Sequence, residues 1–108
     1  MDDSTFQRRA DGALEKLNKA LIPTSEEFDF DCDFNAGALT IAFDDPPTRF
    51  VVSPNSPVRQ IWVSANVKSY KLDWDEKRDE FVLAATGQNL NELMGEAIST
   101  HLGEAITL

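Results

Sequence analysis

The chain has 108 residues, of which 42% are hydrophobic, enough for the core of one domain and too few for two. Its 19 acidic and 10 basic residues give a net charge of −9, which argues against nucleic acid as a partner and favours a basic protein surface or metal cations. One cysteine excludes an internal disulfide and, with one histidine, the usual Cys/His zinc sites, and the absence of a run of about 18 apolar residues argues against a membrane span.

The first expected element is a helix that begins near Asp3 or Ser4. Because a helix turns by about 100° per residue, Asp11 and Glu15 fall together on one flank of its apolar stripe. Pro23 should end the helix, since proline removes a backbone hydrogen bond. The stripe consists of apolar residues at spacings of three and four: Phe6, Ala10, Leu14, Leu17 and Leu21.

The next expected element is a strand from Phe28 to Phe34, in which apolar and acidic residues alternate. Successive side chains of a strand point to opposite faces, so the phenylalanines and Cys32 would enter the core and the acids would form an outer row. Like charges in a row repel one another, which indicates either a cationic partner or a charged edge that prevents aggregation. The row consists of Asp29, Asp31 and Asp33, extended by Glu26 and Glu27.

Further strand patterns occur at residues 38–43, 50–52, 61–63, 70–74 and 81–84, and the first two are joined by a turn at 44–47. Connections this short imply an antiparallel meander. A second helix should begin near Asn89, which stands at capping-box spacing from Glu92, and Gly103 suits its end. The order predicts a single α+β domain over residues 1–108, a two-layer sandwich whose N- and C-terminal helices pack on one face of the antiparallel sheet.

Trp62 is a second functional candidate. If Ile61 and Val63 face the helices, alternation places Gln60 and Trp62 on the open face of the sheet. Exposed aromatic side chains are typical interface anchors, although many tryptophans in sheets are covered by their cross-strand neighbours. The expected companions of Trp62 at such an interface are Asn55 and Arg59.

Several short stretches lie in the order and at the separations typical of the bacterial branch of the frataxin family, which the chain resembles from end to end. The resemblance implies a small protein that binds iron weakly through an exposed acidic ridge on the first helix and strand. It also implies docking onto cysteine desulfurase and the scaffold protein of iron–sulfur cluster assembly. The stretches are Asp3-Ser4-x-Phe6, Ala10-Asp11, Asp29-x-Asp31-Cys32-Asp33-x-Asn35, Gln60-Ile61-Trp62-Val63-Ser64, Tyr70-x-x-Asp73-Trp74 and Leu90-x-x-Leu93-Met94.

Carboxylates without imidazole or thiolate favour hard, labile cations, so the ridge is expected to bind Fe(II) or Fe(III), with other divalent cations able to substitute. Aspartates two apart on a strand stand roughly 6.5–7 Å from each other, too far for tight chelation by consecutive members. Each ion would therefore keep most of its waters and bridge the strand to the helix flank. The candidate ligands are Asp3, Asp11, Glu15, Glu26, Glu27, Asp29, Asp31 and Asp33.

The chain departs from the family pattern in two places. The first helix usually ends in a dense acidic run, where this chain has residues 18–23 without an acid. The loop before the central strand usually reads Asn-Arg/Lys-Gln and here reads Ser53-Pro54-Asn55. These departures leave open how iron loads at that end of the helix and whether the loop contacts a partner.

We expect a binding protein with no catalytic residues, because the chain has no Glu-x-x-His di-iron motif, no set of buried ligands and only one histidine, which is misplaced for such a site. A ferroxidase or iron-storage role, and a pure interaction role with incidental metal binding, remain as alternatives. The start of the chain lacks signal and transit patterns, so we expect a cytoplasmic protein. We also expect a monomer and leave open an iron-dependent oligomer.

Overall fold

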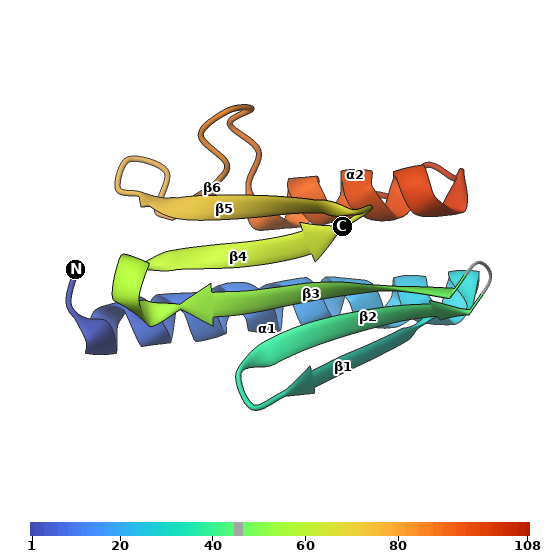
Figure 1. Cartoon of the computed structure of the whole chain (residues 1–108), viewed down its shortest axis with the longest axis horizontal. Coiled ribbons are helices and arrows are strands. Elements are labelled where there is room, and N and C mark those ends of the chain that lie inside the picture. Colours follow the sequence, from blue (N-terminus) through green and yellow to red (C-terminus); the bar gives the residue numbers. More distant parts are fainter. Residues whose placement is uncertain (45–46) are drawn as a thin grey trace.

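The structure is a computed structural model that describes residues 1–44 and 47–108, and it consists of a layer of helices on a layer of strands (Figure 1). The expected turn at 44–47 contains residues 45 and 46, which lie outside the described residues. The elements are, in order, α1 (Asp3–Phe28), β1 (Asp31–Asn35), β2 (Ala38–Asp44), β3 (Pro47–Asn55), the 3₁₀ turn η1 (Ser56–Val58), β4 (Gln60–Ala65), β5 (Lys68–Asp75), β6 (Glu80–Val82) and α2 (Leu90–Leu102).

The six strands form one antiparallel sheet in the order β1-β2-β3-β4-β5-β6, which confirms the predicted meander. One row of inward side chains crosses five of the strands, because each member is paired with the next in the strand register. Leu39, Val52 and Val63 at its centre are buried. The row runs Phe34, Leu39, Val52, Val63, Tyr70.

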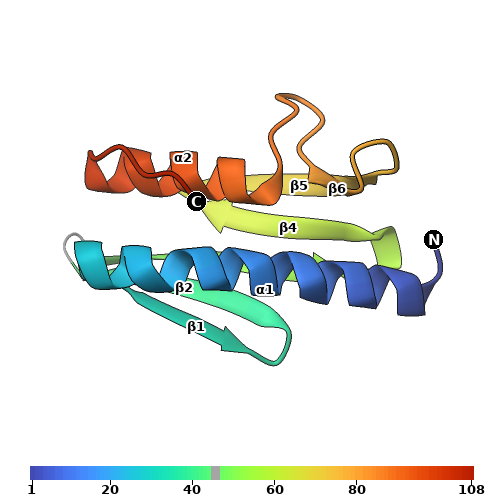
Figure 2. The ribbon, with the colours of Figure 1, turned by 180° about the vertical axis from the view of Figure 1, so that it is seen from behind.

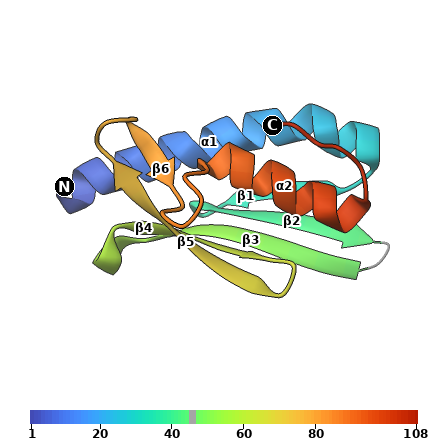
Figure 3. The ribbon, with the colours of Figure 1, turned by 90° about the horizontal axis from the view of Figure 1, so that it is seen from above.

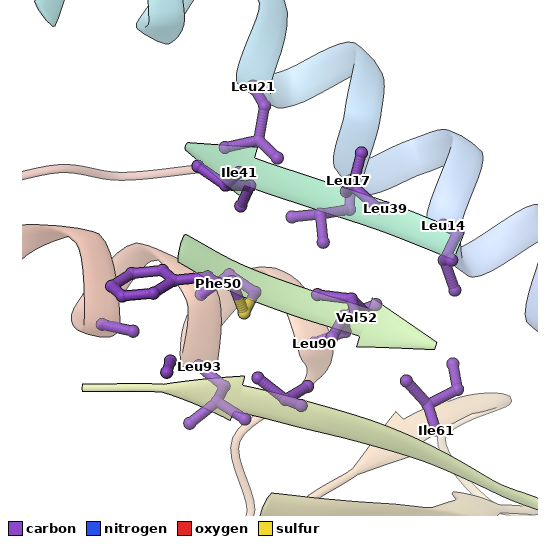
Figure 4. Close-up of a cluster of buried hydrophobic side chains, with 14 of the residues drawn as sticks. Leu14, Leu17, Leu21, Leu39, Ile41, Phe50, Val52, Ile61, Leu90 and Leu93 are labelled. Carbon is purple, nitrogen blue, oxygen red and sulfur yellow. The ribbon is translucent and has the colours of Figure 1, made fainter. Parts of the chain in front are cut away.

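Both helices cover the same face of the sheet, as predicted (Figure 3). The leucines of the α1 stripe lie over β2, and Leu90 and Leu93 of α2 lie over the strands that follow (Figure 4). All five predicted stripe residues of α1 are fully buried, and each large side chain stabilises the fold by roughly 1.5–3 kcal/mol through burial. Within the described residues, neither helix is long and apolar enough to cross a membrane.

The prediction that α1 ends at Pro23 is wrong, because the helix continues to Phe28. Pro23 lies on the exposed side, and two side-chain hydroxyls donate to backbone carbonyls around it: Thr24 Oγ1 to Ala20 O (3.3 Å) and Ser25 Oγ to Ile22 O (2.7 Å). Phe28 extends the apolar stripe by two turns and packs against the core. Its burial offsets the hydrogen bond that Pro23 removes.

The strand therefore begins at Asp31, three residues later than predicted. Glu26 and Glu27 belong to the last turn of α1, and Asp29 ends the helix in the left-handed conformation, with φ 56°. The backbone N–H of Asp29 donates to Ser25 O, which closes the helix end. Of the three aspartates expected on the strand, only Asp31 and Asp33 belong to it, and the two glutamates that extended the row are helical.

The start of α2 carries the predicted capping box between Asn89 and Glu92. Beyond Gly103, which adopts the expected left-handed cap, the tail runs back along α2 (Figure 3). Ile106 N donates to Ser99 Oγ (2.9 Å), and a Cβ atom on Gly95 would lie 3.3 Å from Ile106 O. The glycine thus allows the tail to approach the helix closely.

Candidate functional site

Asp31 and Asp33 lie on the open face of the sheet, the face without helices. Their neighbours Cys32 and Phe34 pack against the core, so alternation turns both aspartates the other way. Both are exposed, and β1 forms one edge of the sheet. The two acids therefore stand at the border of the surface that also contains Trp62.

The acids of α1 are spread along the whole helix. At a rise of 1.5 Å per residue, Asp3 and Glu27 are about 36 Å apart along the axis. Asp11, Glu15 and Glu26 share one flank, where Asp11 Oδ1 accepts a hydrogen bond from Gln7 Nε2 (3.0 Å). β1 runs back beside the second half of the helix (Figure 1, Figure 2), so the predicted ridge is long and has no single centre.

The carboxylates do not form a chelating site in the part of the chain that the structure describes. There, no group of three or more His, Cys, Asp or Glu side chains is placed to hold a metal ion. The strand acids point to the open face of the sheet, whereas Asp11 and Glu15 belong to the helix layer. The arrangement fits hydrated cations held by one or two exposed carboxylates, and the separation of the two sets of acids does not favour the predicted bridge from strand to helix flank.

Cys32 is an unsuitable metal ligand at neutral pH. Burial, with a smaller contribution from the charge of Asp31, raises the pKa of its thiol to about 11. Metals bind the thiolate, which is scarce at this site. Any cation at β1 is therefore left to the carboxylates.

Gln60 and Trp62 lie on the open face as predicted, and Trp62 as a whole residue is 39% exposed. Trp62 Nε1 donates to Gln60 Oε1 (2.9 Å), and Gln60 Nε2 donates to Asp73 Oδ1 (3.0 Å). Lys71 Nζ lies 5.0 Å from the centre of a Trp62 ring, within the range of a cation–π contact. The indole is therefore contacted by its own strand and by β5.

Lys71 and Asp73 also belong to this surface, which the sequence patterns did not indicate. The register pairs them directly with Trp62 and Gln60. The two-residue turn at 66–67 was the available signal, because a turn of that length fixes which residues of β4 and β5 stand opposite each other.

A shallow hollow of about 360 Å³ lies beside Trp62. Small side chains from three strands contribute to its lining, among them Ser53, Ser64 and Ser69, together with Val51. A concave surface next to a half-exposed aromatic ring is typical of an interface anchor.

Of the two expected companions of Trp62, Asn55 lies next to Gln60, whereas the Arg59 side chain contacts the start of α1. Ser53-Pro54-Asn55 is the end of β3 and not a loop, and Asn55 stands opposite Gln60. Arg59 has a left-handed backbone, with φ 55°, and its guanidinium contacts the start of α1. It pairs with Asp3 Oδ1 at 2.6 Å and donates to Met1 O at 3.3 Å, so its side chain is turned away from Trp62.

Comparison with known proteins gives one consistent result. Residues 1–104 match the model of the frataxin-like domain. A protein of Tolumonas auensis named iron-sulfur cluster assembly protein CyaY is 30% identical over 108 residues, which cover 100% of this chain and 99% of that protein. The solved structure of frataxin from Psychromonas ingrahamii, of the CyaY protein family, matches with a TM-score of 0.81 and 23% identity over 99% of this chain and 97% of that one, which shows the shared fold.

Proposed function

The chain belongs to the frataxin family, and from this premise we propose that it acts in the assembly of iron–sulfur clusters as an iron-binding accessory protein. The observation that carries the proposal is the open face of the sheet, which holds Asp31 and Asp33 at one edge and Trp62 three strands away. In the strand register Trp62 stands in the row of Ser53, while Asp33 is displaced from that row by two residues and Asp31 by four. At about 4.8 Å between strands and about 3.4 Å per residue, Trp62 is roughly 16 Å from Asp33 and roughly 20 Å from Asp31. One protein partner can cover both.

Iron is proposed as weakly bound cargo or signal. Exposed carboxylates favour hard cations, and their solvated, spread arrangement favours exchange over retention. The acids of α1 and those of β1 would each hold hydrated Fe(II) or Fe(III) ions, for which other divalent cations substitute. The role is one of binding, and sustained catalytic turnover of Fe(II) oxidation would instead support the ferroxidase alternative.

The proposed partners are cysteine desulfurase and the scaffold protein, as the family resemblance implies. The acidic surface would meet a basic patch on the desulfurase, a contact whose association rate falls with salt. The Trp62 surface would engage the assembled desulfurase–scaffold complex as a desolvated aromatic anchor, which controls the lifetime of the complex.

The experiment is a kinetic binding measurement with the purified desulfurase and its scaffold complex at two ionic strengths. The double variant Asp31→Asn/Asp33→Asn should slow association at low salt, and Trp62→Ala should speed dissociation at both salt concentrations. Asp79→Asn/Glu104→Gln is the matched control, because it also removes two negative charges, from exposed residues outside the proposed ridge, and asparagine suits the left-handed conformation of Asp79. Wild-type kinetics in both test variants would refute the proposal.

A cation titration followed by backbone amide signals tests the iron part separately. Weak binding should perturb residues of β1 and the α1 flank, and Asp31→Asn/Asp33→Asn should remove the effect at β1. Unchanged perturbation at β1 in that variant would refute cation binding by these aspartates, whatever the result with the protein partners.

A further inference from the structure

The indole N–H of Trp62 is held by a chain of two hydrogen bonds that ends on the neighbouring strand. Trp62 Nε1 donates to Gln60 Oε1 at 2.9 Å, and Gln60 Nε2 donates to Asp73 Oδ1 at 3.0 Å. Gln60 and Asp73 stand directly opposite each other in the register of β4 and β5. All three side chains lie on the open face of the sheet.

The chain of bonds has one permitted direction. Asp73 is an acceptor when ionised, and the indole nitrogen is a donor only. If the Gln60 amide were flipped, its oxygen would face the carboxylate and its NH₂ group would face the indole N–H, so both bonds would be lost. The carboxylate of Asp73 therefore fixes the Gln60 amide, and the amide fixes the indole.

We propose that Asp73 is a positioning residue for Trp62: acting through Gln60, it holds the indole in the orientation in which the ring meets a protein partner. The inference rests on the proposed docking of the Trp62 surface. A partner that binds an indole already held in place avoids the usual cost of ordering one large side chain. Its affinity is therefore about two- to tenfold higher than for a mobile indole. Because the N–H already has an acceptor within the chain, the partner contacts the ring and supplies no acceptor.

The test compares Asp73→Ala, which removes the acceptor of the Gln60 amide hydrogen bond, with Asp73→Asn, which keeps an oxygen acceptor for Gln60. In the free protein, the Trp62 indole N–H signal should shift and its hydrogen exchange should become several-fold faster in Asp73→Ala, with both restored in Asp73→Asn. Gln60→Met, which interrupts the chain at its centre, should produce the same change. Glu104→Ala is the control for charge, because it removes a negative charge from the exposed tail.

The second readout is the lifetime of the complex with the desulfurase and scaffold. Asp73→Ala should dissociate about two- to tenfold faster, with Asp73→Asn and Glu104→Ala close to wild type. An unchanged indole signal in Asp73→Ala would overturn the positioning role, even if the lifetime fell. If Trp62→Ala itself left the lifetime unchanged, the docking proposal would fail, whereas the indole signal would still decide whether Asp73 orients the ring.

Discussion

Arg59 Nη1 lies 2.6 Å from Asp3 Oδ1, an ion pair that joins the turn before β4 to the first turn of α1. The same guanidinium donates through Nε to Met1 O at 3.3 Å. The pair occupies one carboxylate of the proposed ridge and the one basic residue that was expected near Trp62. A cation at Asp3 and a partner at Arg59 must each displace this internal contact.

We expect the Asp3–Arg59 pair to contribute little to stability, because the Asp3 side chain is 80% exposed. Arg59→Gln and Asp3→Asn should show a coupling of about 0.5 kcal/mol, within the range for exposed pairs. Added salt should reduce it by screening. A double-mutant cycle by chemical denaturation at two salt concentrations measures the coupling, and a value near 2 kcal/mol would show that the pair has a structural role.

Pro23→Ala should stabilise the protein. The helix continues through Pro23 on its exposed side, so alanine restores a backbone hydrogen bond without disturbing the core. The helical gain of about 3 kcal/mol is partly offset by the greater freedom of the unfolded chain, which leaves about 1–2 kcal/mol. The free energy of unfolding in urea measures this. Pro57→Ala is the control, because Pro57 lies in the first turn of η1, where proline is favourable, and it should bring no gain.

Val67→Gly should also stabilise the protein, through the backbone of the β4–β5 turn. Val67 has φ 63° and a fully exposed side chain, so it carries the cost of a left-handed conformation and buries nothing in return. That cost is about 1–2 kcal/mol for an L-residue, and glycine avoids it. Thermal unfolding should show a higher Tm for Val67→Gly. Val58→Gly, at an exposed valine outside the residues with positive φ, should lower it.

The Cys32 thiol should make stability fall at alkaline pH. Its folded pKa of about 11 lies above the ordinary value of 9.0, so the folded state holds the proton more tightly than the unfolded state does. The contribution is fully present below pH 9 and is lost as the pH rises from 9 towards 11. Because other groups titrate there too, the measurement is the difference in unfolding free energy between wild type and Cys32→Ala. A difference independent of pH would contradict the assignment.

Regular patterns in the sequence were sufficient for most of the fold. The apolar spacing of α1, the meander and the exposed position of Trp62 each follow from a repeat of 3.6 or 2 residues and agree with the structure. The end of α1 could not be predicted from Pro23, because a proline locally disfavours the helix whereas the helix is continued by a tertiary contact, the packing of Phe28 against the core. Asp73 was missed because its role depends on a cross-strand hydrogen bond.

In kinetic terms, the meander allows the sheet to assemble hairpin by hairpin, since every strand pairs only with its neighbours in sequence. Each such closure spans a short loop and takes about 1–10 μs in isolated hairpins. The contact between α1 and α2 joins the two ends of the sequence, which requires the largest loop to close. We therefore expect the sheet to form early and the docking of the two helices to limit the folding rate.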